Sequence, residues 1–256
     1  MFYAKLNEGI IFQNIIQSIK GLFDDLEIEI SRFEGIYIQK LNKSGIAIAS
    51  VKLPPKCFQE FKCEEGFQTG ISIVSLEKVL NDMNDEDCLI LICDDPKKLI
   101  IKLENPKINK ISEYEIPLNE NCSFNKFLIL DKANSDATII LPSKQFEKII
   151  NDLNATGQEI SIKCCSDGKA RFYIEKENEK DIIIDSNHEE EVEKFIKVES
   201  DKEIKFRLNV GILTEFSKAS LVSKQVKLAL SENCPFLAEY KIGEFGLIKF
   251  YLCPIV

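Results

Sequence analysis

The sequence contains a single histidine, His188, which stands in the acidic run SNHEEEVEK. Serine or cysteine triads and histidine-ligated zinc sites all need an imidazole in a structured pocket. The phosphate-binding patterns GxGxxG and GxxxxGK[S/T] are also missing, and no pair of carboxylates stands out from the ordinary acidic surface. The sequence therefore predicts a protein that is not an enzyme and that uses no cofactor and no metal.

The chain has no run of about 18 apolar residues, the length that a membrane span needs. Its opening, MFYAKLNEGIIFQN, lacks the charged-then-apolar pattern of a signal peptide, so we expect the protein to stay inside the cell. The nine cysteines form no CxxC pair and mostly lie in apolar, strand-like runs. We expect reduced, buried thiols. A metal or redox site at the adjacent Cys164 and Cys165 stays open, as does an enzyme that uses one reactive cysteine.

The 33 basic and 42 acidic residues give a formal charge of -9, and the charges are scattered rather than gathered in blocks. This distribution argues against a simple basic nucleic-acid module. A chain of 256 residues can form one large domain or two of about half that size, and either can bury a core. Composition alone leaves both possibilities open.

Period-2 alternation of apolar residues predicts at least thirteen strands, among them GIYIQKL, KLIIKLEN and LIKFYL. Helical spacing appears in four short segments, at residues 9–22, 75–83, 143–153 and 212–220. The order of helix, strands, helix and strands in residues 1–118 recurs in residues 137–256, which predicts two similar domains. Residues 119–136 form the connecting segment, whose apolar kernel at 127–130 suggests that it crosses the surface or receives a partner.

Seven collinear stretches resemble the eukaryotic sliding clamp family, that of proliferating cell nuclear antigen. They are MFYAKL, SLEKVL, ISEYEIPL, LPSKQFEKIINDL, SDGKARF, FSKAS and the pair CPFLAEYKI and LIKFYLCP near the C-terminus. The resemblance runs from end to end. It implies an α+β DNA clamp fold with two similar domains, an N-terminal one at 1–118 and a C-terminal one at 137–256, each with two short helices facing a DNA channel. It further implies a homotrimeric ring around duplex DNA, in the nucleus, that serves as polymerase processivity factor and docking platform for replication and repair proteins.

Closure of a ring would pair and cover two apolar strand edges at once, KISEYEIP in the first domain and KDIIIDS in the second. We expect side chains of the first edge in one chain to contact side chains of the second edge in the neighbouring chain. The predicted interface residues are Ile111, Tyr114 and Ile116 on the first edge, and Ile182 and Ile184 on the second. That these strands are merely interior is the alternative.

A clamp holds DNA without reading its sequence, a task that suits long cations facing phosphates. The family resemblance places such cations on the polar faces of the four helices and on one strand. Neutral residues stand where the family usually adds basic ones, at Gln13, Asn14, Asn81 and Asn151, so we expect weak contact with DNA. The predicted DNA-facing residues are Lys20, Lys78, Lys110, Lys144, Lys148 and Lys218.

In the family, the C-terminal strand end, a hairpin loop and the interdomain segment form an apolar pocket that receives a short peptide motif of polymerases, the clamp loader and other partners. The apolar terminus CPIV would then be bare because partners cover it. The residues that match this pocket are Leu41, Gly45, Ile46, Ile48, Phe127, Ile129, Pro235, Tyr251, Cys253 and Pro254.

Two departures from the family pattern carry expectations of their own. The sequence stops at Val256 without the family's acidic tail, so contacts made by that tail should be missing or replaced. Ser166 stands where the family has the lysine that receives ubiquitin and SUMO, with Lys163 and Lys169 as neighbours. Two alternatives to the homotrimeric clamp remain, a subunit of a heterotrimeric checkpoint-type clamp and a small-molecule-binding β-barrel protein.

Overall fold

The computed structural model describes residues 1–119, 135–165, 169–175, 181–185, 195–198 and 203–255. Within this part of the chain it contains eighteen strands and four α-helices. The contacts divide the chain into two compact units. Unit 1 holds the described residues of 1–43, 49–127 and 241–248, and unit 2 holds those of 44–48, 128–240 and 249–256.

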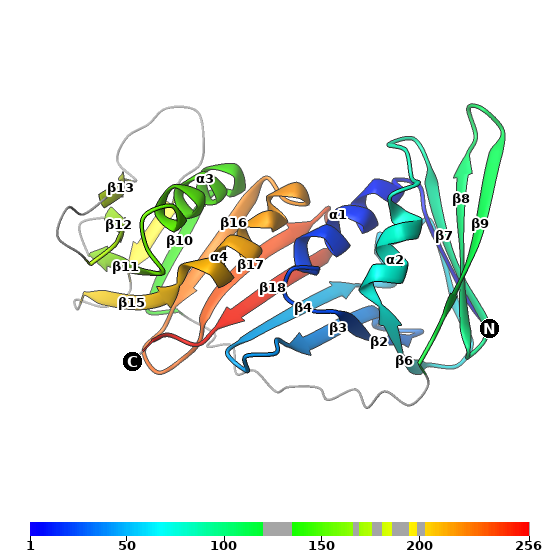
Figure 1. The fold of residues 1–256 in the computed structure, drawn as a ribbon, viewed down its shortest axis with the longest axis horizontal. Coiled ribbons are helices and arrows are strands. Elements are labelled where there is room, and N and C mark those ends of the chain that lie inside the picture. Colours follow the sequence, from blue (N-terminus) through cyan, green and yellow to red (C-terminus); the bar gives the residue numbers. More distant parts are fainter. Residues whose placement is uncertain (120–134, 166–168, 176–180, 186–194, 199–202, 256) are drawn as a thin grey trace. The chain divides into compact units, whose positions relative to one another are not determined.

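Unit 1 is built from antiparallel strands and two helices. Its five-stranded sheet has the order β5 (Glu60–Cys63), β1 (Phe2–Leu6), β7 (Cys88–Asp95), β8 (Lys98–Asn105), β9 (Lys110–Pro117). Separately, β2 (Asp25–Ser31) pairs on one side with β3 (Gly35–Leu41) and on the other with β6 (Phe67–Ser72). Helices α1 (Gly9–Ile19) and α2 (Ile73–Leu80) lie side by side above these strands in Figure 1.

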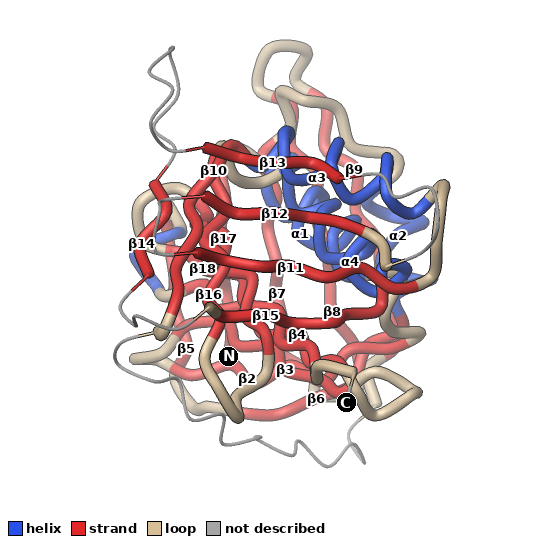
Figure 2. Tube along the Cα trace, turned by 90° about the vertical axis from the view of Figure 1, so that its left-hand side faces the viewer, coloured by secondary structure: helices blue, strands red, loops and turns tan. Residues whose placement is uncertain are grey.

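Unit 2 repeats the same plan. One run of strands has the order β14 (Phe195–Val198), β10 (Ala137–Pro142), β16 (Gln225–Leu230), β17 (Phe236–Ile242). A four-stranded sheet has the order β13 (Asp181–Asp185), β12 (Lys169–Tyr173), β11 (Glu159–Cys165), β15 (Ile204–Asn209), seen as neighbouring strands in Figure 2. Helices α3 (Ser143–Asn154) and α4 (Val210–Ser217) pack against each other. The unit division falls inside three strands: β4 (Ala47–Leu53), β17 and β18 (Gly246–Leu252).

Each helix buries one apolar stripe, as the spacing in the sequence predicts. In α1, Phe12, Ile15, Ile16 and Ile19 are buried at helical intervals. The side chain of Ser72 caps α2 by accepting a hydrogen bond from Ser75 N. Both helices of unit 1 end earlier than predicted, at residues 19 and 80 rather than 22 and 83, and α4 begins at 210 rather than 212.

Five strands beyond the predicted thirteen are present: β1, β5, β6, β7 and β10. The most instructive is β7, whose sequence CLILICDD shows no alternation. This strand lies between β1 and β8, and Leu89, Ile90 and Leu91 are all buried, so both of its faces meet apolar neighbours. A strand covered on both faces gives no period-2 signal.

The core of unit 2 contains a stacked aromatic pair, Phe216 and Phe250, with ring centroids 4.6 Å apart. Tyr240 meets Phe250 edge-on at 6.0 Å and is fully buried. Its hydroxyl has no hydrogen-bond partner among the described residues, and burial raises the pKa of this phenol well above its usual value. A buried polar group left without a partner costs stability.

We expect Tyr240→Phe to raise the free energy of unfolding by about 1 kcal/mol, because it removes the unpartnered hydroxyl while keeping the ring. Urea unfolding followed by circular dichroism measures the change. The matched control is Tyr37→Phe, which removes a hydroxyl that accepts a hydrogen bond from Ser50 Oγ at 3.2 Å and should lower stability. A loss of stability in Tyr240→Phe would contradict the expectation that this hydroxyl is without a hydrogen-bond partner.

Candidate functional site

Helices α1 and α2 bring together two of the predicted DNA-facing lysines and one glutamate. Lys20 follows the end of α1, and its Nζ lies 2.5 Å from Glu77 Oε1 on α2. This hydrogen bond from Lys20 lowers the pKa of Glu77, so the carboxylate is ionised at neutral pH. Lys78, the next residue, is exposed and makes no hydrogen bond or ion pair with described residues. Of the two lysines, only Lys78 could bind an anion without first giving up a carboxylate partner.

Helices α3 and α4 repeat this arrangement. Lys144 pairs with Glu147 at 3.0 Å, and Ser220 Oγ donates to the same carboxylate at 2.6 Å. Burial opposes ionisation of Glu147, but the hydrogen bonds from Ser220 and Lys144 outweigh it and lower the pKa. Lys218 pairs with Glu215 at 2.6 Å. Lys148 is exposed and, within the described part of the chain, has neither a hydrogen bond nor an ion pair.

The three glutamates were not predicted as part of the site. A signal for them exists, because Lys144 and Glu147, and likewise Glu215 and Lys218, stand three residues apart on a helix, where side chains are neighbours. The contact of Glu77 with Lys20 joins two helices and has no such local signature. The sixth predicted lysine, Lys110, is exposed at the start of β9.

Two of the neutral residues on these faces have structural roles. Gln13 Nε2 donates to Leu80 O at 2.7 Å and so ties α1 to the last turn of α2. Asn81 caps α2, its backbone N–H bonding to Glu77 O. At Gln13 the side-chain amide satisfies a carbonyl at this helix end, so the neutral residue that stands where the family resemblance expects a cation has a structural contact of its own.

The predicted partner pocket is represented in unit 2 by the hairpin loop and the C-terminal residues. The backbone N–H of Cys253 donates to Ile46 O at 2.9 Å, so the two segments lie side by side. Gly45 has φ +73°, a conformation that favours glycine, and this turn leaves Ile46 37% exposed. Cys253 is also exposed, whereas Tyr251 is buried.

The remaining pocket residues vary in exposure. Ile48 and Pro254 are half-buried, and Pro235 is exposed; all three belong to unit 2. Leu41, at the end of β3, is half-buried and belongs to unit 1. Phe127 and Ile129 lie outside the described residues, as does Ser166. Within unit 2, the described residues therefore bring the hairpin loop and the C-terminal residues together, and the complete pocket stays a prediction.

The predicted ring edges end their sheets in the described structure: β9 is the last strand of its sheet, and β13 is the last of its own. Ile111 on β9 is 65% exposed, and Ile183 on β13 is 50% exposed. In contrast, Ile116 is 2% exposed and Ile184 is also buried, so their side chains belong to the core of their own chain. Of the predicted edge side chains, these two are thus packed inside their own chain.

Two further edge residues were predicted. Tyr114 is half-buried and donates its hydroxyl to Asp82 Oδ2 at 2.9 Å, and Ile182 is half-buried. Because side chains alternate along a strand, the outward position on β13 is Ile183, one residue away from each predicted isoleucine. A shift of one residue along a strand moves the side chain to the other face.

The cysteines are less buried than predicted. Cys63, Cys93 and Cys164 are buried, Cys57, Cys88 and Cys234 are half-buried, and Cys253 is exposed; all seven are free thiols. Burial raises the pKa of Cys57, Cys63 and Cys93, which makes these thiols poor nucleophiles. Among the described residues, no cluster of three or more potential metal ligands is found, and no helix has the length and apolar character to cross a membrane.

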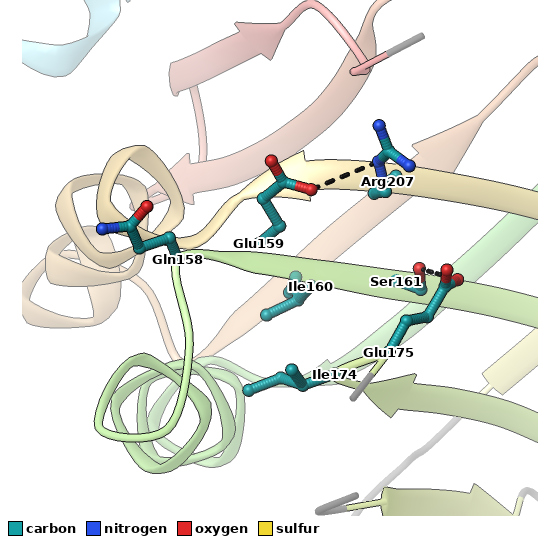
Figure 3. A pocket seen from close by; sticks show the side chains of 7 residues that line it. All are labelled: Gln158, Glu159, Ile160, Ser161, Ile174, Glu175 and Arg207. Atoms are coloured by element: carbon teal, nitrogen blue, oxygen red, sulfur yellow. Dashed lines mark hydrogen bonds and ion pairs between the residues drawn. The ribbon is translucent and has the colours of Figure 1, made fainter. Parts of the chain in front are cut away.

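Unit 2 also has an open polar pocket of about 270 Å³ on β11 and β15 (Figure 3). Its charged groups are paired, since Arg207 Nε lies 3.3 Å from Glu159 Oε2 and Ser161 Oγ donates to Glu175 at 2.7 Å. Ile255 N donates to Arg207 O at 2.8 Å, so the C-terminal residues run beside this edge strand. This pocket coincides with none of the predicted sites.

Comparison with known proteins addresses both halves of the chain. The model of the proliferating cell nuclear antigen N-terminal domain matches residues 1–123, and that of the C-terminal domain matches residues 129–255. Proliferating cell nuclear antigen of Chaetomium thermophilum is 29% identical over 257 residues, covering 99% of this chain and 98% of the relative. The protein of the same name from Dictyostelium discoideum is 28% identical over 263 residues, covering 99% of each chain.

These matches confirm the resemblance seen in the sequence and the two-domain α+β clamp fold, and they favour neither the checkpoint-type subunit nor the small-molecule-binding barrel. With family models covering both halves of the sequence in order, the chain belongs to the proliferating cell nuclear antigen family, the DNA sliding clamps.

Proposed function

We propose that this clamp is a homotrimer that encircles duplex DNA in the nucleus, without catalysis of its own, and holds a polymerase and other partners through the pocket beside Ile46 and Cys253. The observation that carries the proposal is the collinear match of the two family models, residues 1–123 and 129–255. The two domains are taken as 1–118 and 137–256, joined by 119–136.

Two features of the structure support a ring. Strands β9 and β13 end their sheets, and each presents an exposed isoleucine on an unpaired edge. Such edges invite pairing with another chain, and head-to-tail pairing that closes on itself gives a ring. The exposed Lys78 and Lys148 supply sequence-independent contacts to phosphates.

Retention on DNA tests the proposal directly. The protein is loaded onto nicked circular plasmid by a clamp loader and ATP, and the DNA is separated by gel filtration before and after cutting with a restriction enzyme. A ring held by topology stays on the circle in high salt and leaves when the circle is cut. Equal loss from intact and cut plasmid would refute encirclement.

The partner pocket gives a separate prediction. A peptide with the family's interaction motif should bind at micromolar order, and Ile46→Ala should weaken binding by roughly 1 to 3 kcal/mol, because Ile46 is the exposed apolar side chain of the hairpin wall. Isothermal calorimetry measures the loss. Phe33→Ala, which truncates an exposed side chain on another hairpin, is the control and should leave the affinity unchanged. If Ile46→Ala binds as wild type does, the hairpin is not part of the pocket.

A further inference from the structure

The two helix pairs share a charge arrangement that the proposed function does not use. Residues 77–82 read Glu-Lys-Val-Leu-Asn-Asp, and residues 147–152 read Glu-Lys-Ile-Ile-Asn-Asp. In each unit the glutamate contacts the element that follows the neighbouring helix: Glu77 contacts Lys20 after α1, and Glu147 contacts Ser220 after α4. The following residue, Lys78 or Lys148, is exposed in both.

We propose that Glu77 and Glu147 act as built-in counter-charges, which keep the helix-face lysines Lys20 and Lys144 occupied and so weaken the hold of the clamp on DNA phosphates. The inference rests on the proposed function, because it assigns a role within the same DNA-facing surface. It makes the two glutamates positioning residues, since they act through the lysines they hold.

A DNA phosphate gains less binding free energy from a lysine that is already paired than from one that is not. A free lysine that neutralises a phosphate releases a condensed counterion from the DNA, and this release supplies most of non-specific affinity. Lys20 already lies 2.5 Å from a carboxylate, and Lys144 lies 3.0 Å from one. A phosphate must displace that carboxylate, which remains close by as a like charge, so the net gain is small.

Each of the two carboxylates is held in place by a second hydrogen bond. The side chain of Glu77 is about a quarter exposed, as is that of Glu147, and each accepts a second hydrogen bond: Gln17 Nε2 donates to Glu77 at 3.4 Å, and Ser220 Oγ donates to Glu147. Two donors on one carboxylate fix its position better than one flexible ammonium does. The counter-charges therefore stay on the surface when the lysines move.

The test compares two double variants with the same change in net charge. Glu77→Gln with Glu147→Gln removes the two counter-charges and keeps the side-chain shape. Glu34→Gln with Glu60→Gln removes two carboxylates that pair with Lys52 and Lys62, lysines that lie on strands and are not among the predicted DNA-facing residues. Fluorescence anisotropy measures binding of each purified clamp, with its molar mass checked, to a short linear duplex between 50 and 200 mM salt.

We expect the Glu77/Glu147 variant to bind DNA more tightly and with a steeper salt dependence. The slope of log K against log salt should steepen by about 0.9 for each additional phosphate that a lysine neutralises. Each such phosphate is worth about a threefold change in affinity over that salt range. The gain from Glu77→Gln should shrink in a Lys20→Ala background, a coupling that a merely structural role would not produce.

Three outcomes overturn the inference: affinity and slope equal to wild type, an equal gain in the Glu34/Glu60 control, or a Glu77→Gln gain that does not depend on Lys20. Each leaves the proposed function standing if wild-type protein still leaves plasmid only after the circle is cut. Loss from intact circles would refute the ring itself, whatever the slopes show.

Discussion

Ile111→Asp and Ile183→Asp should each convert a trimer of about 88 kDa, three chains of 29.2 kDa, into folded monomers. Both side chains are exposed in the single chain, so the substitutions should cost the monomer little. In a closed ring the same carboxylate would be buried against the neighbouring chain without a partner, which costs several kcal/mol per interface. Light scattering coupled to gel filtration measures the mass.

Phe33→Asp is the matched control, because it introduces the same charge at a side chain that is 86% exposed on a hairpin turn. It should remain a trimer. Ile116→Asp serves as a contrast: that side chain is buried in its own chain, so the substitution should destabilise the fold rather than separate the chains. A trimer in both edge variants would refute the edge assignment, and a wild-type monomer at micromolar concentration would refute the ring.

Lys78→Ala with Lys148→Ala should reduce DNA binding more than Lys20→Ala with Lys144→Ala, although each pair removes two positive charges. The reason is that Lys78 and Lys148 have no partners among the described residues, whereas the other two are held by Glu77 and Glu147. The salt slope should flatten by about 0.9 for each phosphate that is no longer neutralised. Binding to a linear duplex across a salt series measures this slope.

Trimer mass and peptide binding should be unchanged in both pairs, which separates weaker phosphate binding from misfolding. Loading on circular plasmid should fall with Lys78→Ala and Lys148→Ala, while clamps already loaded should stay until the circle is cut. If the two pairs lose equal affinity, carboxylate pairing does not decide which lysines reach DNA.

The sequence predicts most of the elements in their correct order, because the spacing of apolar residues in an amphipathic strand or helix indicates which face is buried. The spacing predicts a stripe of Ile11, Ile15, Ile16 and Ile19; the last three are buried, whereas Ile11 is half-buried and Phe12 is buried beside them. Strand β7 was missed because burial on both faces removes the alternation on which the prediction depends. Boundaries of α1 and α2 were misplaced by two or three residues, where the last apolar residue of a stripe lies beyond the helix.

Site residues were predicted less completely, for reasons that lie in tertiary contacts. The exposure of Lys78 follows from the polar face of α2, but the capture of Lys20 by Glu77 depends on how two helices separated by more than fifty residues meet. In β13, Ile183 is the exposed isoleucine, whereas Ile182 and Ile184 are on the other face of the strand. No local pattern distinguishes these cases, because all three isoleucines are consecutive.

The division of the chain into units bears on the order in which a ribosome could complete them. Unit 1 contains residues 241–248 as well as the first part of the chain. Ile242 is buried there, Gly246 packs against Leu53, and Lys56 Nζ lies 5.5 Å from the ring centroid of Phe245.

During synthesis, domains ordinarily fold as units with the N-terminal one first. Unit 1 includes residues synthesised almost two hundred positions after Leu53, so we expect it to be completed only when these residues emerge. Closing such a long loop is slow and leaves apolar surface uncovered in the meantime. The nascent chain should therefore depend on chaperones until its last strand emerges, and a fragment of residues 1–118 expressed alone should aggregate.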